Sequence, residues 1–143
     1  MSHPDNLVEI RDLSVAFVSG DNHRQVVNSI SFDIRRGETL ALVGESGSGK
    51  SVTAHSILRL LPYPLAQHPS GTIHYDGQDL LKLPERKLRG IRGNRIAMVF
   101  QEPMTSLNPL HSIEKQINEV LALHKGLRGK AATQRTLELL ELV

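Results

Sequence analysis

The sequence predicts an α/β fold, because strand-like and helix-like patterns follow one another around one glycine-rich loop. Apolar residues alternate with polar or small residues over Leu7–Phe17 and again over Val26–Ile34, as in the two strands of an antiparallel hairpin. A continuous apolar run, Thr39–Val43, is typical of a strand that is buried on both faces. The stretch Val52–Leu61 contains no helix breaker and predicts a helix directly after the loop.

Further along the chain, the signals alternate between turns, short strands and helices. The prolines from Pro62 to Pro69 exclude regular structure there, and the turn Asp76-Gly77 predicts a hairpin that starts from a strand at Gly71–Tyr75. The other predicted elements are a short strand at Gln78–Leu81, a helical turn at Pro84–Leu88, a mostly apolar strand at Arg95–Phe100, a helix capped by Ser112 that reaches His124, and a helix over Ala131–Val143.

The composition excludes several classes of protein. The 17 Lys and Arg nearly balance the 15 Asp and Glu, and aromatic residues make up only 3%, which argues against a nucleic-acid partner. There is no cysteine, so neither a disulfide nor a thiolate zinc site forms. No apolar run approaches the roughly 20 residues of a membrane helix. The first residues, Met1–Asn6, do not have the pattern of a secretory signal. We therefore expect the chain to stay in the cytosol.

The loop from Gly44 to Ser51 fits the pattern G-x-x-x-x-G-K-[ST], which is the phosphate-binding loop of P-loop NTPases. Glycines let the backbone curl so that successive N–H groups point at anionic oxygens, and the following helix adds the positive end of its dipole. Lys50 supplies a mobile charge for the phosphates, and the Ser51 hydroxyl is a suitable ligand for Mg²⁺. The alternative is a glycine-rich turn that binds nothing. The residues expected to contact a nucleotide here are Gly44, Glu45, Ser46, Gly47, Ser48, Gly49, Lys50, Ser51 and Val52.

A second segment narrows the class of NTPase. The stretch Met98–Pro109 has the sequence MVFQEPMTSLNP. Together with the sequence of Leu40–Ser51, it resembles the nucleotide-binding domain of an ABC transporter. In particular, it resembles this domain in importers for dipeptides, oligopeptides and nickel. The segments Arg59–Pro62, Leu88–Asn94 and Leu107–His111 look closest to the Yej-type ATPases of microcin C and peptide import. The resemblance implies a P-loop fold of ABC type, with an antiparallel β subdomain, parallel core strands and the start of a helical subdomain.

The resemblance also implies roles for residues outside the loop. Phe17 lies where the family places an aromatic ring that stacks on adenine, for which an ordinary core phenylalanine is the alternative. Gln101 matches the glutamine that reaches Mg²⁺ and the attacking water, so the implied catalytic residues are Lys50 and Gln101 and the implied metal ligands are Ser51 and Gln101. The residues that match the family's contact with the membrane permease subunits are Thr105, Ser106, Leu107 and Asn108.

The sequence departs from the family in what it lacks. The L-S-G-G-Q signature, the strand ending in Asp-Glu and the switch histidine are absent. We therefore interpret residues 1–6 as a tail and residues 7–143 as the N-terminal portion of the domain, truncated inside the helical subdomain. The glutamate that would polarise water is missing, so this piece is expected to bind ATP but not to hydrolyse it.

The function implied is that of an ATP-binding component at the cytoplasmic face of the cell membrane. With ATP and Mg²⁺, the complete protein would power import of peptides or peptide-like compounds of the microcin C type. Its implied partners are the permease subunits, a second ABC ATPase domain and, indirectly, a periplasmic binding protein. Two alternatives stay open: a soluble ABC-type ATPase that acts on nucleic acid, and a nucleotide-binding relic that does not hydrolyse ATP.

Overall fold

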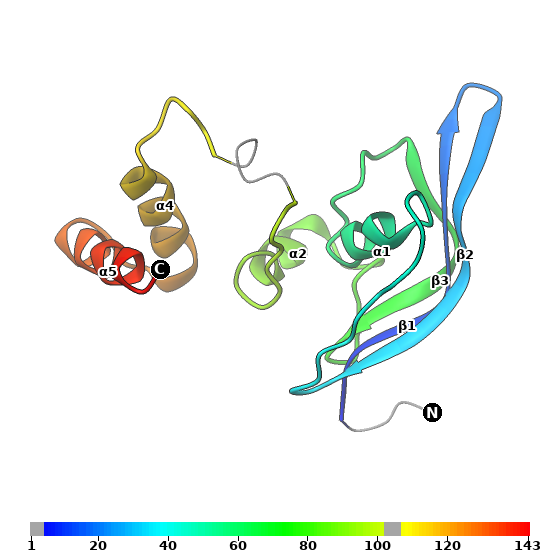
Figure 1. Cartoon of the computed structure of the whole chain (residues 1–143), viewed down its shortest axis with the longest axis horizontal. Coiled ribbons are helices and arrows are strands. Elements are labelled where there is room, and N and C mark those ends of the chain that lie inside the picture. Colours follow the sequence, from blue (N-terminus) through cyan, green and yellow to red (C-terminus); the bar gives the residue numbers. More distant parts are fainter. Residues whose placement is uncertain (1–4, 102–106) are drawn as a thin grey trace. The chain divides into compact units, whose positions relative to one another are not determined.

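The computed structural model describes residues 5–101 and 107–143. The chain forms two compact units, which divide between Leu88 and Arg89. The first unit contains a four-stranded antiparallel sheet with the order β2-β1-β3-β4 and the helix α1 (Figure 1). The second contains two longer helices. The elements of the first unit are β1 (Asn6–Ser19), β2 (Asn22–Arg35), α1 (Lys50–Ile57), β3 (Ala66–Tyr75) and β4 (Gln78–Asp79). Those that follow are α2 (Glu85–Ile91), which crosses the division, α4 (Ile113–Lys125) and α5 (Lys130–Glu141).

The hairpin of β1 and β2 is the framework of the first unit. Its strands pair in antiparallel register from Asn6 opposite Arg35 to Ser19 opposite Asn22, as the alternating apolar pattern predicts. Three side chains of β1 are completely buried in the core, those of Ile10, Leu13 and Val15. Figure 1 shows α1 beside one face of this sheet, so the helix covers the apolar side of the hairpin.

The strand β3 begins earlier than the sequence predicts. It starts at Ala66 and contains Pro69, although the prolines of this segment were expected to exclude regular structure. The register between β1 and β3 shifts on both sides of the Ser14–Ser70 pair. Proline is tolerated at such irregularities because a residue there need not donate a ladder hydrogen bond. The predicted turn at Asp76-Gly77 is confirmed, since both residues have positive φ angles, of 48° and 77°, between β3 and β4.

Two predicted strands do not form. Thr39–Val43 has no strand structure, and Leu40, Leu42 and Val43 are exposed to 41%, 45% and 86%. The segment Arg95–Phe100 shows only a single bridge, between Ile96 and Arg92. A parallel core strand needs neighbouring strands for its backbone hydrogen bonds. Within residues 5–101 and 107–143, none of the named strands pairs with either segment, so the predicted parallel core strands are wrong for this chain as described.

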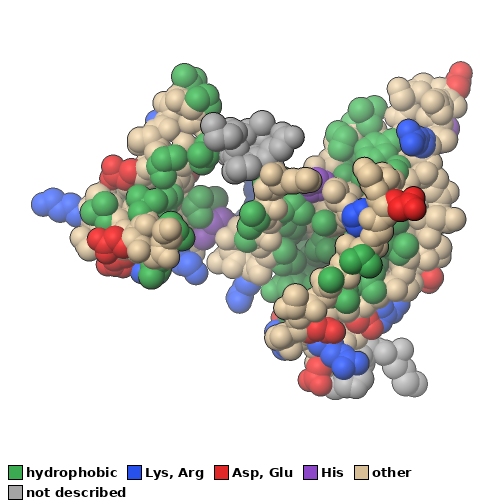
Figure 2. All heavy atoms as spheres, viewed as in Figure 1, with side chains coloured by type: hydrophobic (Ala, Val, Ile, Leu, Met, Phe, Trp, Pro, Cys, Tyr) green, Lys and Arg blue, Asp and Glu red, His purple; other side chains and the backbone are tan. Residues whose placement is uncertain are grey.

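The second unit is built around the pair α4 and α5. The Ser112 side chain accepts a hydrogen bond from the Lys115 N–H at 3.2 Å, which confirms the predicted cap of α4, and Gly126 ends the helix with a φ of 68°. The buried Thr136 hydroxyl of α5 donates to the Asn118 side chain of α4 at 2.7 Å. Hydrophobic side chains also reach the surface of both units (Figure 2). None of the helices that the structure describes is long and apolar enough to cross a membrane.

A glycine in β3 gives a test of the sheet. An added Cβ at Gly71, whose φ is 93°, would lie 2.5 Å from the Leu13 Cα and 2.6 Å from the Arg11 carbonyl oxygen. We expect Gly71→Ala to lower the free energy of unfolding by at least about 3 kcal/mol, because strain and a backbone clash add. Chemical denaturation measures this change.

The matched control is Gly77→Ala. Gly77 has a similar φ of 77°, but an added Cβ would meet nothing within 4 Å. Its cost should be about 1–2 kcal/mol, from the left-handed conformation alone. Equal destabilisation by the two substitutions would contradict the close approach of Gly71 in β3 to the backbone of β1.

The cap of α4 gives a second test. Ser112→Ala removes the acceptor for the Lys115 N–H and should weaken the start of the helix by about 1 kcal/mol. Hydrogen exchange of the Lys115 amide should then be faster by about fivefold. Ser112→Asp keeps an acceptor and should keep the exchange slow, whereas unchanged exchange in Ser112→Ala would contradict the cap.

Candidate functional site

The glycine-rich loop passes directly from Gly44 into the first turn of α1. Gly49 precedes the helix with a φ of 89°. A Cβ on Gly49 would lie 2.9 Å from the Val26 carbonyl oxygen and 3.0 Å from the Val27 Cγ2 atom. Only a glycine therefore lets the start of α1 come this close to β2. The consequence is that the loop and the hairpin meet at one place.

The Lys50 ammonium holds the curl of the loop together. Its Nζ atom donates hydrogen bonds to the carbonyl oxygens of Gly44 and Glu45, at 2.7 and 2.6 Å, and lies 3.3 Å from the Ser48 hydroxyl. The same ammonium can bind a phosphate, because phosphate oxygens accept hydrogen bonds as the loop carbonyl oxygens do and also carry negative charge. The loop thus holds a cation among its own oxygen atoms.

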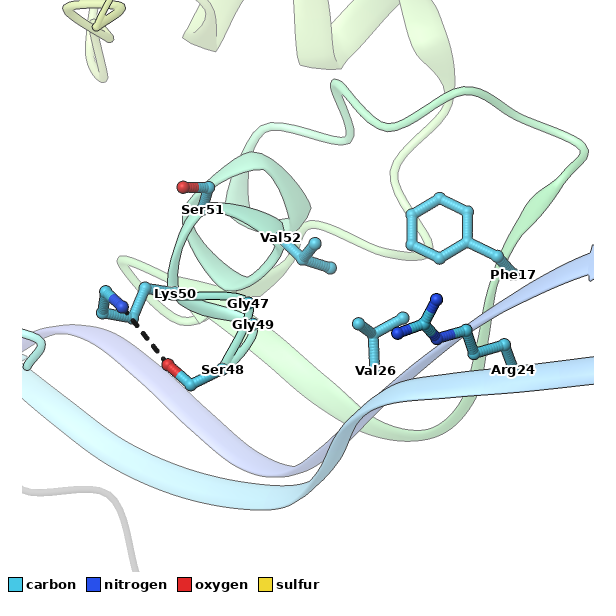
Figure 3. A pocket seen from close by; sticks show the side chains of 9 residues that line it. All are labelled: Phe17, Arg24, Val26, Gly47, Ser48, Gly49, Lys50, Ser51 and Val52. Carbon is cyan, nitrogen blue, oxygen red and sulfur yellow. Dashed lines mark hydrogen bonds between the residues drawn. The ribbon is translucent and has the colours of Figure 1, made fainter. Parts of the chain in front are cut away.

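A pocket of about 450 Å³ joins this loop to the hairpin. Figure 3 shows the loop and the first turn of α1 on one side of it, with side chains from β1 and β2 on the other. One end is formed by the glycine-rich loop with Lys50 and Ser51, and the other by Phe17, Arg24 and Val26 of the hairpin. The residues that line the pocket are Phe17, Arg24, Val26, Gly47, Ser48, Gly49, Lys50, Ser51 and Val52.

Most of the nucleotide contacts predicted from the sequence lie in this one place. Phe17 lines the pocket together with Val52 and the loop residues from Gly47 onward. Gly44 and Glu45 do not line the pocket, but their carbonyl oxygens accept hydrogen bonds from the Lys50 ammonium. Ser46 is exposed in the loop and does not line the pocket. The loop residues come together because they are consecutive in the sequence, whereas Phe17 reaches the pocket only through the fold of the hairpin.

The other predicted site residues belong to the second unit. Gln101 is exposed there and does not line the pocket, which is made entirely by the first unit. Leu107 and Asn108 are also exposed, while Thr105 and Ser106 lie outside the described residues. The backbone of Asn108 forms two hydrogen bonds with the Gln116 side chain, at 3.0 and 3.1 Å, which fixes this residue at the start of α4.

Two pocket residues were missed by the sequence analysis, Arg24 and Val26 of β2. In the hairpin register, Arg24 lies directly opposite Phe17. The turn at Gly20-Asp21 is the signal that could have found it, because Ser19 pairs with Asn22 and counting back along both strands brings Arg24 to Phe17. The predicted hairpin placed its second strand at Val26–Ile34, so it did not include Arg24.

The pocket offers hydroxyl oxygens, from Ser48 and Ser51, that suit Mg²⁺. Mg²⁺ usually takes one or two protein ligands and completes its shell with waters and phosphate oxygens. Ser51 is exposed and lines the pocket, so its hydroxyl fits this role when phosphate is present. Elsewhere in the described ranges there is no cluster of three or more His, Asp or Glu that would bind a metal alone. The residues thus fit a metal that arrives with a nucleotide.

Comparison with known proteins gives concordant relatives. "Peptidoglycan transport ATP-binding protein YejF" of Agrobacterium fabrum is 65% identical over 134 residues, which are 94% of this chain and 24% of that protein. "Uncharacterized ABC transporter ATP-binding protein YejF" of Escherichia coli is 58% identical over 96% of this chain and 26% of that protein. "Oligopeptide transport ATP-binding protein OppD" of Bacillus subtilis is 46% identical over 96% of this chain and 38% of that protein. The chain thus spans about a quarter of the length of its YejF relatives.

Solved structures and a family model agree with these relatives. The ATP-binding cassette MJ0796 in a dimeric, post-hydrolysis state bound to ADP and Pi matches with a TM-score of 0.79 and 25% identity, over 94% of this chain and 56% of that one. The fold is therefore that of an ABC ATPase, a P-loop NTPase with an antiparallel sheet. The model of the ABC transporter family matches residues 27–143. With the loop, the hairpin and the pocket between them in place, this chain belongs to the ABC transporter family.

Proposed function

We propose that this chain is the nucleotide-binding part of an ATPase subunit that powers import of peptides or peptide-like compounds. The observation that carries the proposal is the pocket of about 450 Å³ that joins the phosphate-binding loop to Phe17. A cation, a glycine-rich loop and an aromatic ring around one cavity match the phosphates and the base of a nucleotide. The ring would bind the base, and the loop would bind the phosphates.

In this proposal, Lys50 changes partners when ATP binds. Its ammonium is held by the carbonyl oxygens of Gly44 and Glu45, and the phosphates replace these two neutral acceptors with charged ones. The amides of the loop and the N-terminus of α1 add partial positive charge along the phosphate chain. Phe17 stacks on the adenine from the hairpin side, and Val52 packs against the nucleotide from α1.

Mg²⁺ enters with the nucleotide in this proposal. Ser51 would hold the ion through its hydroxyl, and Gln101 is the other ligand that the family resemblance implies for the ion and the attacking water. When bound, the ion would supply positive charge next to the phosphates for phosphoryl transfer, a reaction that depends on positioning and electrostatics. Lys50 serves the same purpose from the loop, which makes Lys50 and Gln101 the proposed catalytic residues.

The proposed transporter also contains a second ATPase domain and membrane permease subunits. The MJ0796 cassette is described as dimeric, which supports pairing with a second ABC ATPase domain. The exposed Leu107 and Asn108, with Thr105 and Ser106, are proposed to contact the membrane permease subunits, which places the protein at the cytoplasmic face of the membrane. A periplasmic binding protein would then act indirectly, through those subunits.

The names of the relatives support a peptide-class cargo. One YejF relative is named for peptidoglycan transport, and the OppD relative is named for oligopeptide transport. We propose peptides or peptide-like compounds of the microcin C type as cargo. The near-balanced charge, +2 overall, favours this function over the action of a soluble ABC ATPase on nucleic acid.

Removing the Lys50 ammonium tests the site. Lys50→Ala in the full-length protein should weaken MgATP binding by roughly 10- to 100-fold, because a charge-assisted hydrogen bond contributes about 1.5–3 kcal/mol. Calorimetric titration measures the affinity. Lys87→Ala, which removes an exposed lysine of α2 outside the pocket, is the control and should bind as the wild type does. Equal affinity in Lys50→Ala and the wild type would refute the site.

Uptake by living cells tests the transport role. A chromosomal Lys50→Ala substitution should reduce uptake of a labelled oligopeptide by at least about tenfold, because phosphoryl transfer depends on this charge. It should also protect cells of a sensitive strain against microcin C. The Lys87→Ala strain should behave as the parent does. Normal peptide uptake in the Lys50→Ala strain would contradict the transport proposal, and lost peptide uptake with unchanged microcin C sensitivity would remove the microcin C cargo alone.

A further inference from the structure

We infer that Arg24 contacts the nucleobase and makes this site accept guanine nucleotides as well as adenine nucleotides. The inference rests on the proposed function, because it assigns a base-reading residue to the same pocket. It concerns a side chain that the phosphate-binding motif does not include.

The position of Arg24 places it at the base end of the pocket. It lies opposite Phe17 in the β1–β2 register, and both residues line the pocket. Figure 3 shows the Phe17 ring and the Arg24 guanidinium extending from the hairpin into the space before the loop, with Val26 beside the guanidinium. The Arg24 guanidinium would therefore lie next to a base that stacks on Phe17.

The hydrogen-bonding groups of Arg24 are free for a ligand. Among the residues that the structure describes, Arg24 has neither an ion pair nor a side-chain hydrogen bond, whereas Lys50 already binds two loop carbonyls. The side chain is also exposed. The phosphates have their own donors at the other end of the pocket, in the loop amides and Lys50. Arg24 is thus a cation at the opposite end, where the base is expected.

The chemistry of a guanidinium favours one purine edge. Arginine offers five N–H donors in a planar fork and no acceptor. Guanine presents two acceptors side by side, O6 and N7, which the fork can bind together. Adenine presents one acceptor, N7, beside an amino group that is itself a donor. A donor-only side chain at this edge therefore gains more from guanine than from adenine, while stacking on Phe17 serves both bases.

The test compares affinities for MgATP and MgGTP in the full-length protein. Arg24→Ala removes the fork, and Arg24→Gln replaces it with an amide, which pairs with the N6 and N7 positions of adenine. His23→Ala, an exposed neighbour that does not line the pocket, is the matched control. Binding that Lys50→Ala weakens by at least about tenfold is counted as binding at this site, which separates it from any other nucleotide site of the protein.

We expect the wild type to bind GTP at least as tightly as ATP. Arg24→Ala should weaken GTP binding at least about fivefold while changing ATP binding less than about twofold, and Arg24→Gln should reverse the preference toward ATP. The control should leave both affinities unchanged. A wild type that prefers ATP more than about tenfold, or an Arg24→Ala variant that loses both nucleotides equally or neither, overturns the inference. Failure of the wild type to bind either nucleotide overturns the proposed function itself.

Discussion

The close approach of Gly49 to β2 is the constraint on which the site depends. An added Cβ there would lie 2.9 Å from the Val26 carbonyl oxygen, so the helix can start against the strand only because this residue has no side chain. That contact brings the first turn of α1 to the hairpin, where Phe17 and Arg24 stand opposite one another. The loop supplies charge and the hairpin supplies the aromatic ring. Neither segment forms the pocket alone.

The electrostatics of the pocket divide it into two ends with different partners. At the loop end, the Lys50 ammonium already satisfies two backbone carbonyls, which stabilises the curl before any phosphate arrives. At the hairpin end, the Arg24 cation is exposed beside an aromatic ring and aliphatic groups. In the proposed function, a ligand that is anionic at one end and aromatic at the other would meet complementary groups at both ends of the pocket.

Local signals were enough to predict the elements that satisfy their own backbone hydrogen bonds. The hairpin, the loop into α1, the Asp76-Gly77 turn and the Ser112 cap follow from nearby residues, and the structure confirms them. Thr39–Val43 and Arg95–Phe100 failed because a strand depends on partners elsewhere, which apolar composition does not reveal. Pro69 falls inside β3 because the register shifts there. Arg24 was missed because its role depends on cross-strand pairing, which the loop motif does not encode.

The central claim is that the loop and the hairpin form one nucleotide site. Titrating the full-length protein with MgATP while following its backbone amide resonances tests this claim most directly. We predict that the amides of Gly47–Ser51 and those of Phe17 and Val26 shift together, with the same midpoint, and that Lys50→Ala raises that midpoint for both segments. Shifts confined to the loop, or different midpoints for the two segments, would contradict the account.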